Sequence, residues 1–192
     1  MRALTLYRPW TDLITRCPLP FAKRVENRTW APPLSVLGET IALHAGRTYD
    51  EDGATSIALK LMGTRCEWTL PEDEESPQGI VGLARIVGFK SDQRLGFMAD
   101  MPGRLAWTRR LDQPFGFGLS DTEKARERAV LALPHDRWWT GPYGWLLDEV
   151  VAIEPIACVG ARGLWPVPER VATEVAAAAR VARGETRRVG GG

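Results

Sequence analysis

Stretches with the composition of β-strands outnumber helical stretches in this chain, and the two kinds do not alternate regularly. Six stretches are predicted to be strands: 3–7, 23–30, 40–45, 79–89, 143–147 and 150–157. A doubly wound parallel sheet needs a helix between nearly all successive strands, so this order excludes it. The sequence instead predicts a mainly-β fold of the α+β class, in which short helices lie at the rim of a small barrel or a strongly curved sheet.

Apolar residues recur at helical spacing in three further places outside these strands. The first helix is predicted to begin at Pro9, and its apolar face has members at i, i+3, i+4 and i+7: Trp10, Leu13, Ile14 and Cys17. Thr48 and Glu51 have the spacing of a capping box, which predicts a second helix that ends at Gly63. The stretch 168–183 has an apolar stripe and is predicted to be the last helix.

The segment 91–137 is rich in glycine, proline and charged residues, and it interrupts the pattern of strands. We interpret it as an insertion into the domain. Ser120 and Glu123 form a second capping box, which predicts a helix from about Asp121 to Leu133. Pro134 would end that helix, because the residue before a proline is disfavoured in the α conformation.

The bulk composition is that of a single globular domain. The chain has 192 residues, of which 44% are apolar, and this suffices to bury one core. We expect the domain to span residues 1–165, with a C-terminal helix over 166–184 packed on it and a disordered tail over 185–192. The formal net charge of +1 gives no general attraction to nucleic acids or membranes.

The few cysteines and histidines predict a reduced protein without a metal centre. The three cysteines are scattered and odd in number, which argues against a disulfide framework. The two histidines do not cluster with them, so we expect neither a metal nor another cofactor. The first residues turn polar at once, unlike a signal peptide, and no apolar run approaches the ~20 residues of a membrane helix. These features predict a cytoplasmic protein that does not bind a membrane, and they leave its oligomeric state open.

Three charged side chains, Lys23, Glu26 and Arg28, lie close together in the second predicted strand. Successive side chains of a strand alternate between its faces, so Glu26 and Arg28 share one face. A carboxylate between two cations stays ionised, and a partly buried lysine beside an arginine becomes a usable base. The triplet therefore fits three roles that the residues alone leave open: a structural ion network, a ligand-binding site or a catalytic site.

The chain contains eight tryptophans, and several of them lie near other candidate residues. Aromatic faces beside arginines stack nucleic-acid bases, with each stacked base worth ~1–3 kcal/mol; filling the core is the alternative role. The aromatic candidates are Trp10, Trp30, Trp138, Trp139, Tyr143 and Trp145. Trp138 and Trp139 are adjacent, so on an extended segment one of them would point outward. His44 ends an apolar strand, where it is either a ligand-binding group or a structural histidine.

The residues around the charged triplet resemble the ASCH family, whose domains belong to the PUA-like class of small β-barrels. The usual signature of the family, Gly-x-Lys-x-x-Glu-x-Arg, corresponds here to Phe21–Arg28. The lysine, the glutamate and the arginine match, and Phe21 replaces the glycine. Residues 3–10, 41–46 and 141–147 are similar to further stretches of the family in the same order.

This resemblance implies a PUA-like barrel with a working cleft around the triplet, and a nucleic-acid-associated function. The partner that it implies is RNA, single-stranded DNA or a modified nucleoside. The residues that we expect to contact a nucleotide are Arg8, Trp10, Lys23, Glu26, Arg28, Trp30, His44, Trp139, Tyr143 and Trp145.

Other functions remain open at this stage. One branch of the family resembles amidohydrolases that remove acyl groups from the exocyclic nitrogen of cytidine, and Lys23 and Glu26 would then be the catalytic residues. A threonine can occupy the place of Glu26 in that branch, so here the glutamate itself would serve as the general base. The resemblance also implies ribonuclease activity. A different class is a protein-binding scaffold that uses the segment 91–137 and the last helix to dock a partner.

Overall fold

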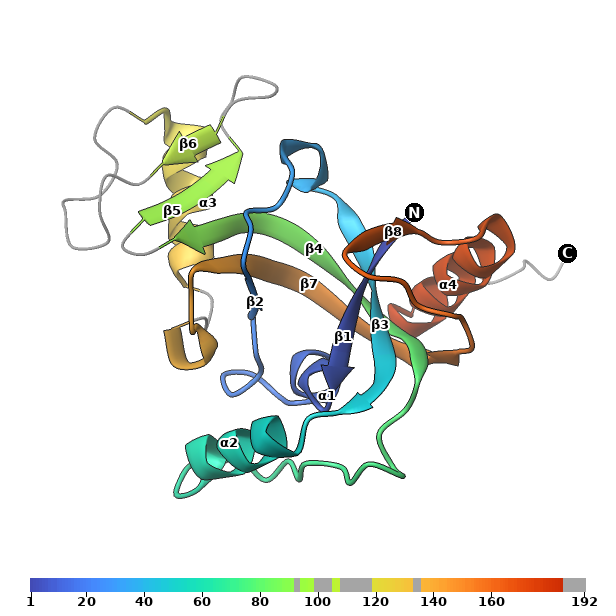
Figure 1. Cartoon of the computed structure of the whole chain (residues 1–192). Helices are drawn as coiled ribbons and strands as arrows, with labels where there is room; N and C mark the ends of the chain where they lie inside the picture. Colours follow the sequence, from blue (N-terminus) through green and yellow to red (C-terminus); the bar gives the residue numbers. More distant parts are fainter. Residues whose placement is uncertain (92–93, 99–104, 108–118, 133–135, 185–192) are drawn as a thin grey trace, which may run out of the picture. The chain divides into compact units, whose positions relative to one another are not determined.

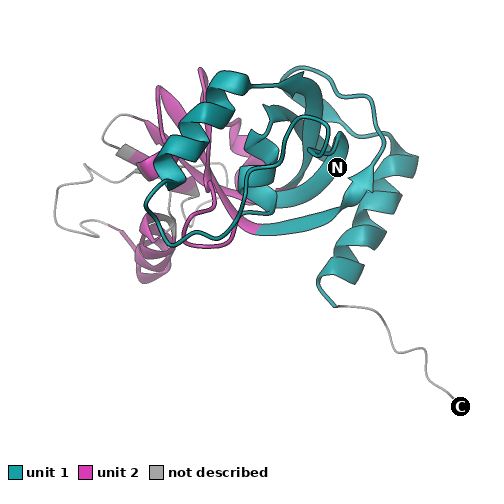
Figure 2. Cartoon of the chain, turned by 90° about the horizontal axis from the view of Figure 1, so that it is seen from below, with its two compact units in different colours: residues 1–17, 41–84, 150–192 teal, residues 18–40, 85–149 magenta. Residues whose placement is uncertain are grey.

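A computed structural model of the chain describes all residues except 92–93, 99–104, 108–118, 133–135 and 185–192. The described part has an α+β fold with a mixed β-sheet and four α-helices (Figure 1). It divides into two compact units (Figure 2): unit 1 contains residues 1–17, 41–84 and 150–192, and unit 2 contains residues 18–40 and 85–149. The predicted tail and much of the predicted insertion lie outside the described residues.

Unit 1 holds the first strands and three of the helices. Its elements are β1 (Arg2–Arg8), α1 (Trp10–Thr15), β3 (Thr40–Tyr49), α2 (Glu51–Leu61), β8 (Leu164–Pro166) and α4 (Glu169–Ala182). The elements of unit 2 are β2 (Val25–Arg28), η1 (Leu34–Val36), β5 (Arg94–Met98), β6 (Leu105–Trp107), α3 (Asp121–Leu131) and η2 (Asp136–Trp138). Three strands contribute residues to both units: β3, whose first residue Thr40 belongs to unit 2, β4 (Gly79–Ser91) and β7 (Tyr143–Ile156).

The sheet has the strand order β2-β7-β4-β3-β1-β8, with β5 beside β4 and β6 beside β5. It is mixed, because β1 runs parallel to β3 and antiparallel to β8. β2 is antiparallel to β7. The path of hydrogen-bonded strands ends at β2 and at β8, so the described strands form an open sheet.

In unit 1, α4 packs its apolar stripe onto the sheet. Val175 and Ala179 of this helix are buried together with Ala3 of β1 and Trp165 of β8. The predicted last helix is therefore confirmed, and its apolar side belongs to the core of unit 1. An exposed apolar stripe on this helix would favour the scaffold hypothesis, but Val175 and Ala179 are buried.

The first helix and the helix after Ser120 also follow the sequence pattern. Leu13 and Ile14 of the predicted apolar face are buried in α1 together with Thr11 and Asp12, and Cys17 is buried just beyond the end of the helix at Thr15. The capping box of α3 is confirmed, because the Ser120 amide donates to the Glu123 carboxylate and the Glu123 amide donates to the Ser120 hydroxyl. The end of this helix differs slightly, since α3 stops at Leu131.

Two local predictions are wrong. The N-cap of α2 is Asp50, whose carboxylate accepts a hydrogen bond from the Gly53 amide, so Thr48 and Glu51 do not form the capping box. The two predicted closing strands, 143–147 and 150–157, form the single strand β7. Glu149 lies inside it with a φ of 48°, and this left-handed residue produces the break in alternation that the sequence pattern shows.

Candidate functional site on the β2–β7 pair

The pairing of β2 with β7 places four of the predicted site residues on one face. Glu26 lies opposite Trp145, and Arg28 lies opposite Tyr143. Residues opposite each other in an antiparallel pair share a face, as do alternate residues of one strand. We call this surface of unit 2, together with Lys23, the charged face. The Phe89 ring of β4 extends it, with its centroid 6.3 Å from that of Tyr143.

An ion cluster lies at the centre of the charged face. The Lys23 Nζ donates a hydrogen bond to Glu26 Oε2 at 2.6 Å, and Arg28 Nε lies 3.3 Å from Glu26 Oε1. Both oxygens of one carboxylate thus face a cation. The side chain of Lys23 is 3% exposed and that of Arg28 is 20% exposed, so water reaches the arginine much more than the lysine. The three formal charges sum to +1, which favours an anionic ligand at the exposed end.

The aromatic side chains of this face differ in how much solvent reaches them. Trp145 is fully buried, its indole N–H donates to the Trp30 carbonyl at 2.9 Å, and the two rings meet edge to face at 4.6 Å. Trp30 is exposed and Tyr143 is half-buried. Trp145 therefore supports the face from inside the core, whereas Trp30 and Tyr143 are accessible to a planar ligand.

Trp139 lies on the opposite side of the β2–β7 pair, which we call the reverse face. A Cβ atom added to Gly144 would stand 2.7 Å from Trp139 Cδ1 and 2.4 Å from a methyl carbon of Val25, which shares the reverse face. The Lys90 ammonium group stands 4.4 Å from the centre of the Trp139 ring. Trp139 is thus separated by the strands themselves from the charged cluster, and Gly144 provides the space for its ring.

Sequence reasoning missed the role of Asn27, a polar residue of β2 that points to the reverse face. Its side-chain amide donates to the Trp138 carbonyl at 2.9 Å, and its side-chain oxygen accepts from the Thr140 amide at 3.0 Å. Asparagine is disfavoured within strands, so its position inside β2 was a signal that the side chain has a specific partner. Trp138 was predicted on an extended segment, but it closes the 3₁₀ turn η2 and is buried.

Arg8 belongs to unit 1, where its guanidinium group is surrounded by acceptors. It donates to the carbonyls of Gly46, Arg47, Asp73 and Ser76, and it also pairs with the Asp73 carboxylate at 2.7 Å. These five contacts match the five N–H donors of an arginine. Arg8 therefore anchors the loop around Asp73 to the sheet of unit 1, and this structural task occupies the donors that were predicted to meet a nucleotide.

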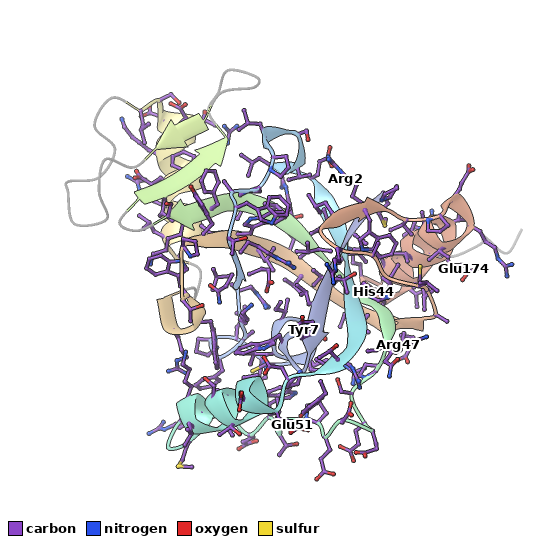
Figure 3. All side chains as sticks on the ribbon, viewed as in Figure 1. Arg2, Tyr7, His44, Arg47, Glu51 and Glu174 are labelled. Atoms are coloured by element: carbon purple, nitrogen blue, oxygen red, sulfur yellow. The ribbon has the colours of Figure 1, made fainter. Side chains whose placement is uncertain are left out.

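Trp10 and His44 also belong to unit 1 and have structural partners there. The Trp10 indole N–H donates to the Asp50 carboxylate at 2.7 Å. His44 lies on β3 (Figure 3), and its Nε2 is 2.9 Å from the Cys158 carbonyl. Its buried Nδ1 has no hydrogen-bond partner among the described residues. A Cβ on Gly160 would come within 2.6 Å of that nitrogen, so glycine allows the chain to cover the ring.

Among the described residues, no group of three or more histidine, cysteine, aspartate or glutamate side chains is placed to hold a metal ion. Among the helices of the described residues, none combines the length and the apolar composition needed to span a membrane. Comparison of the sequence with protein-family models and with curated proteins gives no match.

Proposed function

We propose that this protein is an ASCH-type, PUA-like nucleic-acid-binding domain whose charged face holds one nucleotide of a single strand. Its sequence supports the family assignment through the ordered motifs around Lys23, Glu26 and Arg28. The charged face supports the ligand class, because it combines an excess positive charge with accessible aromatic rings. A nucleotide has the complementary groups, an anionic phosphate and a planar base.

The observation that carries the proposal is the contrast in burial within the ion cluster. Lys23 and Glu26 are withdrawn from solvent, whereas Arg28 extends from the same cluster toward water beside Tyr143 and Trp30. A guanidinium group binds phosphate oxygens with two parallel N–H donors, and its plane stacks on bases. We assign phosphate or base-edge recognition to Arg28, base stacking to Trp30 and Tyr143, and orientation of Arg28 to Glu26.

The test measures the affinity for a fluorescently labelled single-stranded RNA octamer by anisotropy. Replacement of Arg28 by glutamine removes a charge-assisted hydrogen bond, so we expect roughly a tenfold weakening. The plot of log K against log salt should also become shallower by about one unit. Arg85→Gln is the matched control, because Arg85 is also an arginine of unit 2 and pairs with Glu149 on its exposed surface. Equal effects of the two variants would reject the proposal and indicate general charge attraction.

Amidohydrolysis of an N4-acylated cytidine is the second candidate, and the short Lys23–Glu26 contact favours it. A buried lysine that donates a hydrogen bond to a carboxylate at 2.6 Å is placed for general acid–base catalysis. Water would attack the acyl carbon of N4-acetylcytidine, the amide C–N bond would break, and cytidine and acetate would leave. Incubation with N4-acetylcytidine, analysed for cytidine by chromatography, tests this candidate. Turnover that Lys23→Met abolishes supports it, and absence of turnover in the wild type rejects it.

A further inference from the structure

We infer that Trp138 and Asn27 are positioning residues that hold Lys23 beside Glu26, and that the charged face depends on them. This inference concerns how the proposed site is maintained, and its relevance to ligand binding rests on the proposed function. Its structural part is testable without any ligand.

The chain segment that carries Lys23 has little regular structure of its own. Residues 18–22 form a turn in which the amides of Phe21 and Ala22 donate to the Pro18 carbonyl at 2.9 and 3.0 Å. Lys23 and Arg24 then lead into β2, and the Arg24 carbonyl already accepts a hydrogen bond from the Leu147 amide of β7 at 3.0 Å. Lys23 thus lies between the turn 18–22 and the start of the β2–β7 pairing, and contacts on either side of it hold this segment in place.

Trp138 supplies the anchor before Lys23. Its indole N–H donates to the Phe21 carbonyl at 3.0 Å, across 117 residues of sequence. The neighbouring Arg137 guanidinium group stands 5.8 Å from the centre of the Phe21 ring. The hydrogen bond fixes the backbone of the turn at Phe21, and the contact with Arg137 fixes the Phe21 ring.

Asn27 supplies the anchor after Lys23, and it acts on the same segment. Its side-chain amide binds the backbone of Trp138 and Thr140 from the reverse face of β2. Trp138 is thus bound through its side chain to Phe21 and through its carbonyl to Asn27. These contacts connect the two ends of the stretch 21–27, which contains both Lys23 and Glu26. A change in the segment 138–140 would consequently shift the lysine relative to the carboxylate.

The first test is the substitution Trp138→Phe, which keeps an aromatic ring and removes the indole N–H. Trp165→Phe is the matched control, because the Trp165 indole donates a hydrogen bond of the same 3.0 Å length to Thr5 within unit 1. The readout is the ¹H–¹⁵N signal of the Lys23 ammonium group, assigned by its loss in Lys23→Met. We expect its proton exchange to accelerate about fivefold in Trp138→Phe, as loss of one hydrogen bond predicts, and to be unchanged in Trp165→Phe.

Asn27→Ala provides an independent variant if Trp138→Phe does not fold, and the same acceleration is expected. An unchanged Lys23 signal in the folded variants, or an equal change in Trp165→Phe, would overturn the inference. RNA affinity is measured in parallel and should fall about fivefold in Trp138→Phe. If the wild type binds no RNA but the Lys23 signal responds as expected, the proposed function fails while the positioning role stands.

Discussion

Lys23 and Glu26 are both shielded from water, so their stability contributions depend on each other. Moving a charged group into a protein interior costs several kcal/mol, and the attraction of a partner at close range offsets that cost. The pair at 2.6 Å, with Arg28 on the second carboxylate oxygen, provides this compensation. A cluster of this kind adds little net stability compared with apolar residues, but it becomes costly when one member is removed.

We therefore expect Glu26→Gln to lower the free energy of unfolding by about 3 kcal/mol, because the Lys23 charge stays buried without the carboxylate. The double variant Lys23→Met/Glu26→Leu should lose much less, since both charges are gone. Urea unfolding at neutral pH measures both values. A double variant that is as unstable as Glu26→Gln would contradict the expectation and indicate that side-chain shape, rather than charge, determines stability here.

Asp12 in α1 provides a prediction about pH. Its buried carboxylate accepts a hydrogen bond from the Ser76 hydroxyl at 2.6 Å. Burial raises the pKa of Asp12 above its usual 3.8, although Ser76 and Arg16 act in the opposite direction. The folded state therefore binds this proton more tightly than the unfolded state, so the contribution of Asp12 to stability increases as pH falls through the raised pKa toward 3.8.

Asp12→Asn removes this contribution. The unfolding free energies of the variant and the wild type should therefore depend differently on pH only between the raised pKa of Asp12 and 3.8. Relative to the variant, the wild type should gain stability as the pH is lowered from neutrality toward 3.8. Urea titrations at several pH values measure the difference. Asp52→Asn, on the exposed side of α2, controls for the general loss of one carboxylate. A difference between wild type and Asp12→Asn that is constant with pH would show that Asp12 has the same pKa in both states.

At the scale of elements, the cap of α2 shows why spacing alone can mislead. Asp50 accepts hydrogen bonds from the Gly53 amide and from the Trp10 indole, whereas Thr48 is an exposed residue of β3. We expect Asp50→Ala to lower the unfolding free energy by about 2 kcal/mol, because it removes an N-cap together with a hydrogen bond to a charged group. Thr48→Ala should change it by less than about 0.5 kcal/mol. Thermal unfolding of the two variants measures both changes. A larger loss of stability in Thr48→Ala than in Asp50→Ala would indicate that Thr48 is the N-cap.

Periodicity in the sequence predicted the helices, whose hydrogen bonds join residues close in sequence. It failed for short strands, whose structure depends on pairing with distant strands. The helices α1 and α4 were predicted because apolar residues recur at helical spacing in the sequence of each. The short strands β5, β6 and β8 have three to five residues and no alternation to detect, so their structure depends on partners distant in sequence.

The same limit applies to the candidate site. The spacing of Glu26 and Arg28 predicted correctly that they share a face. Trp139, another predicted site residue, lies on the reverse face, where Gly144 leaves space for its ring, and spacing within the sequence does not reveal this position. No pattern within residues 21–28 indicates that Trp138 binds the Phe21 carbonyl.

At the scale of the whole molecule, neither compact unit is a continuous piece of chain. Unit 1 is assembled from three segments and unit 2 from two, and β4 and β7 each contribute residues to both. Neither unit is therefore complete until strands from distant parts of the sequence have paired. Pairing distant strands closes long loops, and the entropy cost of closure is paid before the stabilising contacts form. Partly folded structures therefore have little stability.

We consequently expect the chain to unfold in one cooperative transition, in spite of its two units. Fluorine-labelled tryptophan follows the unfolding of each unit separately. Trp165 reports on β8 in unit 1, Trp145 reports on β7 in unit 2, and both side chains are buried. Their ¹⁹F signals should give the same urea midpoint, which should also match the loss of secondary structure measured by circular dichroism. Midpoints that differ would mean that one unit stays folded without the other. In that case β4 and β7 would stay folded only in the part that belongs to the remaining unit. If unit 2 remains, nucleotide binding by its charged face should be measured after unit 1 has unfolded.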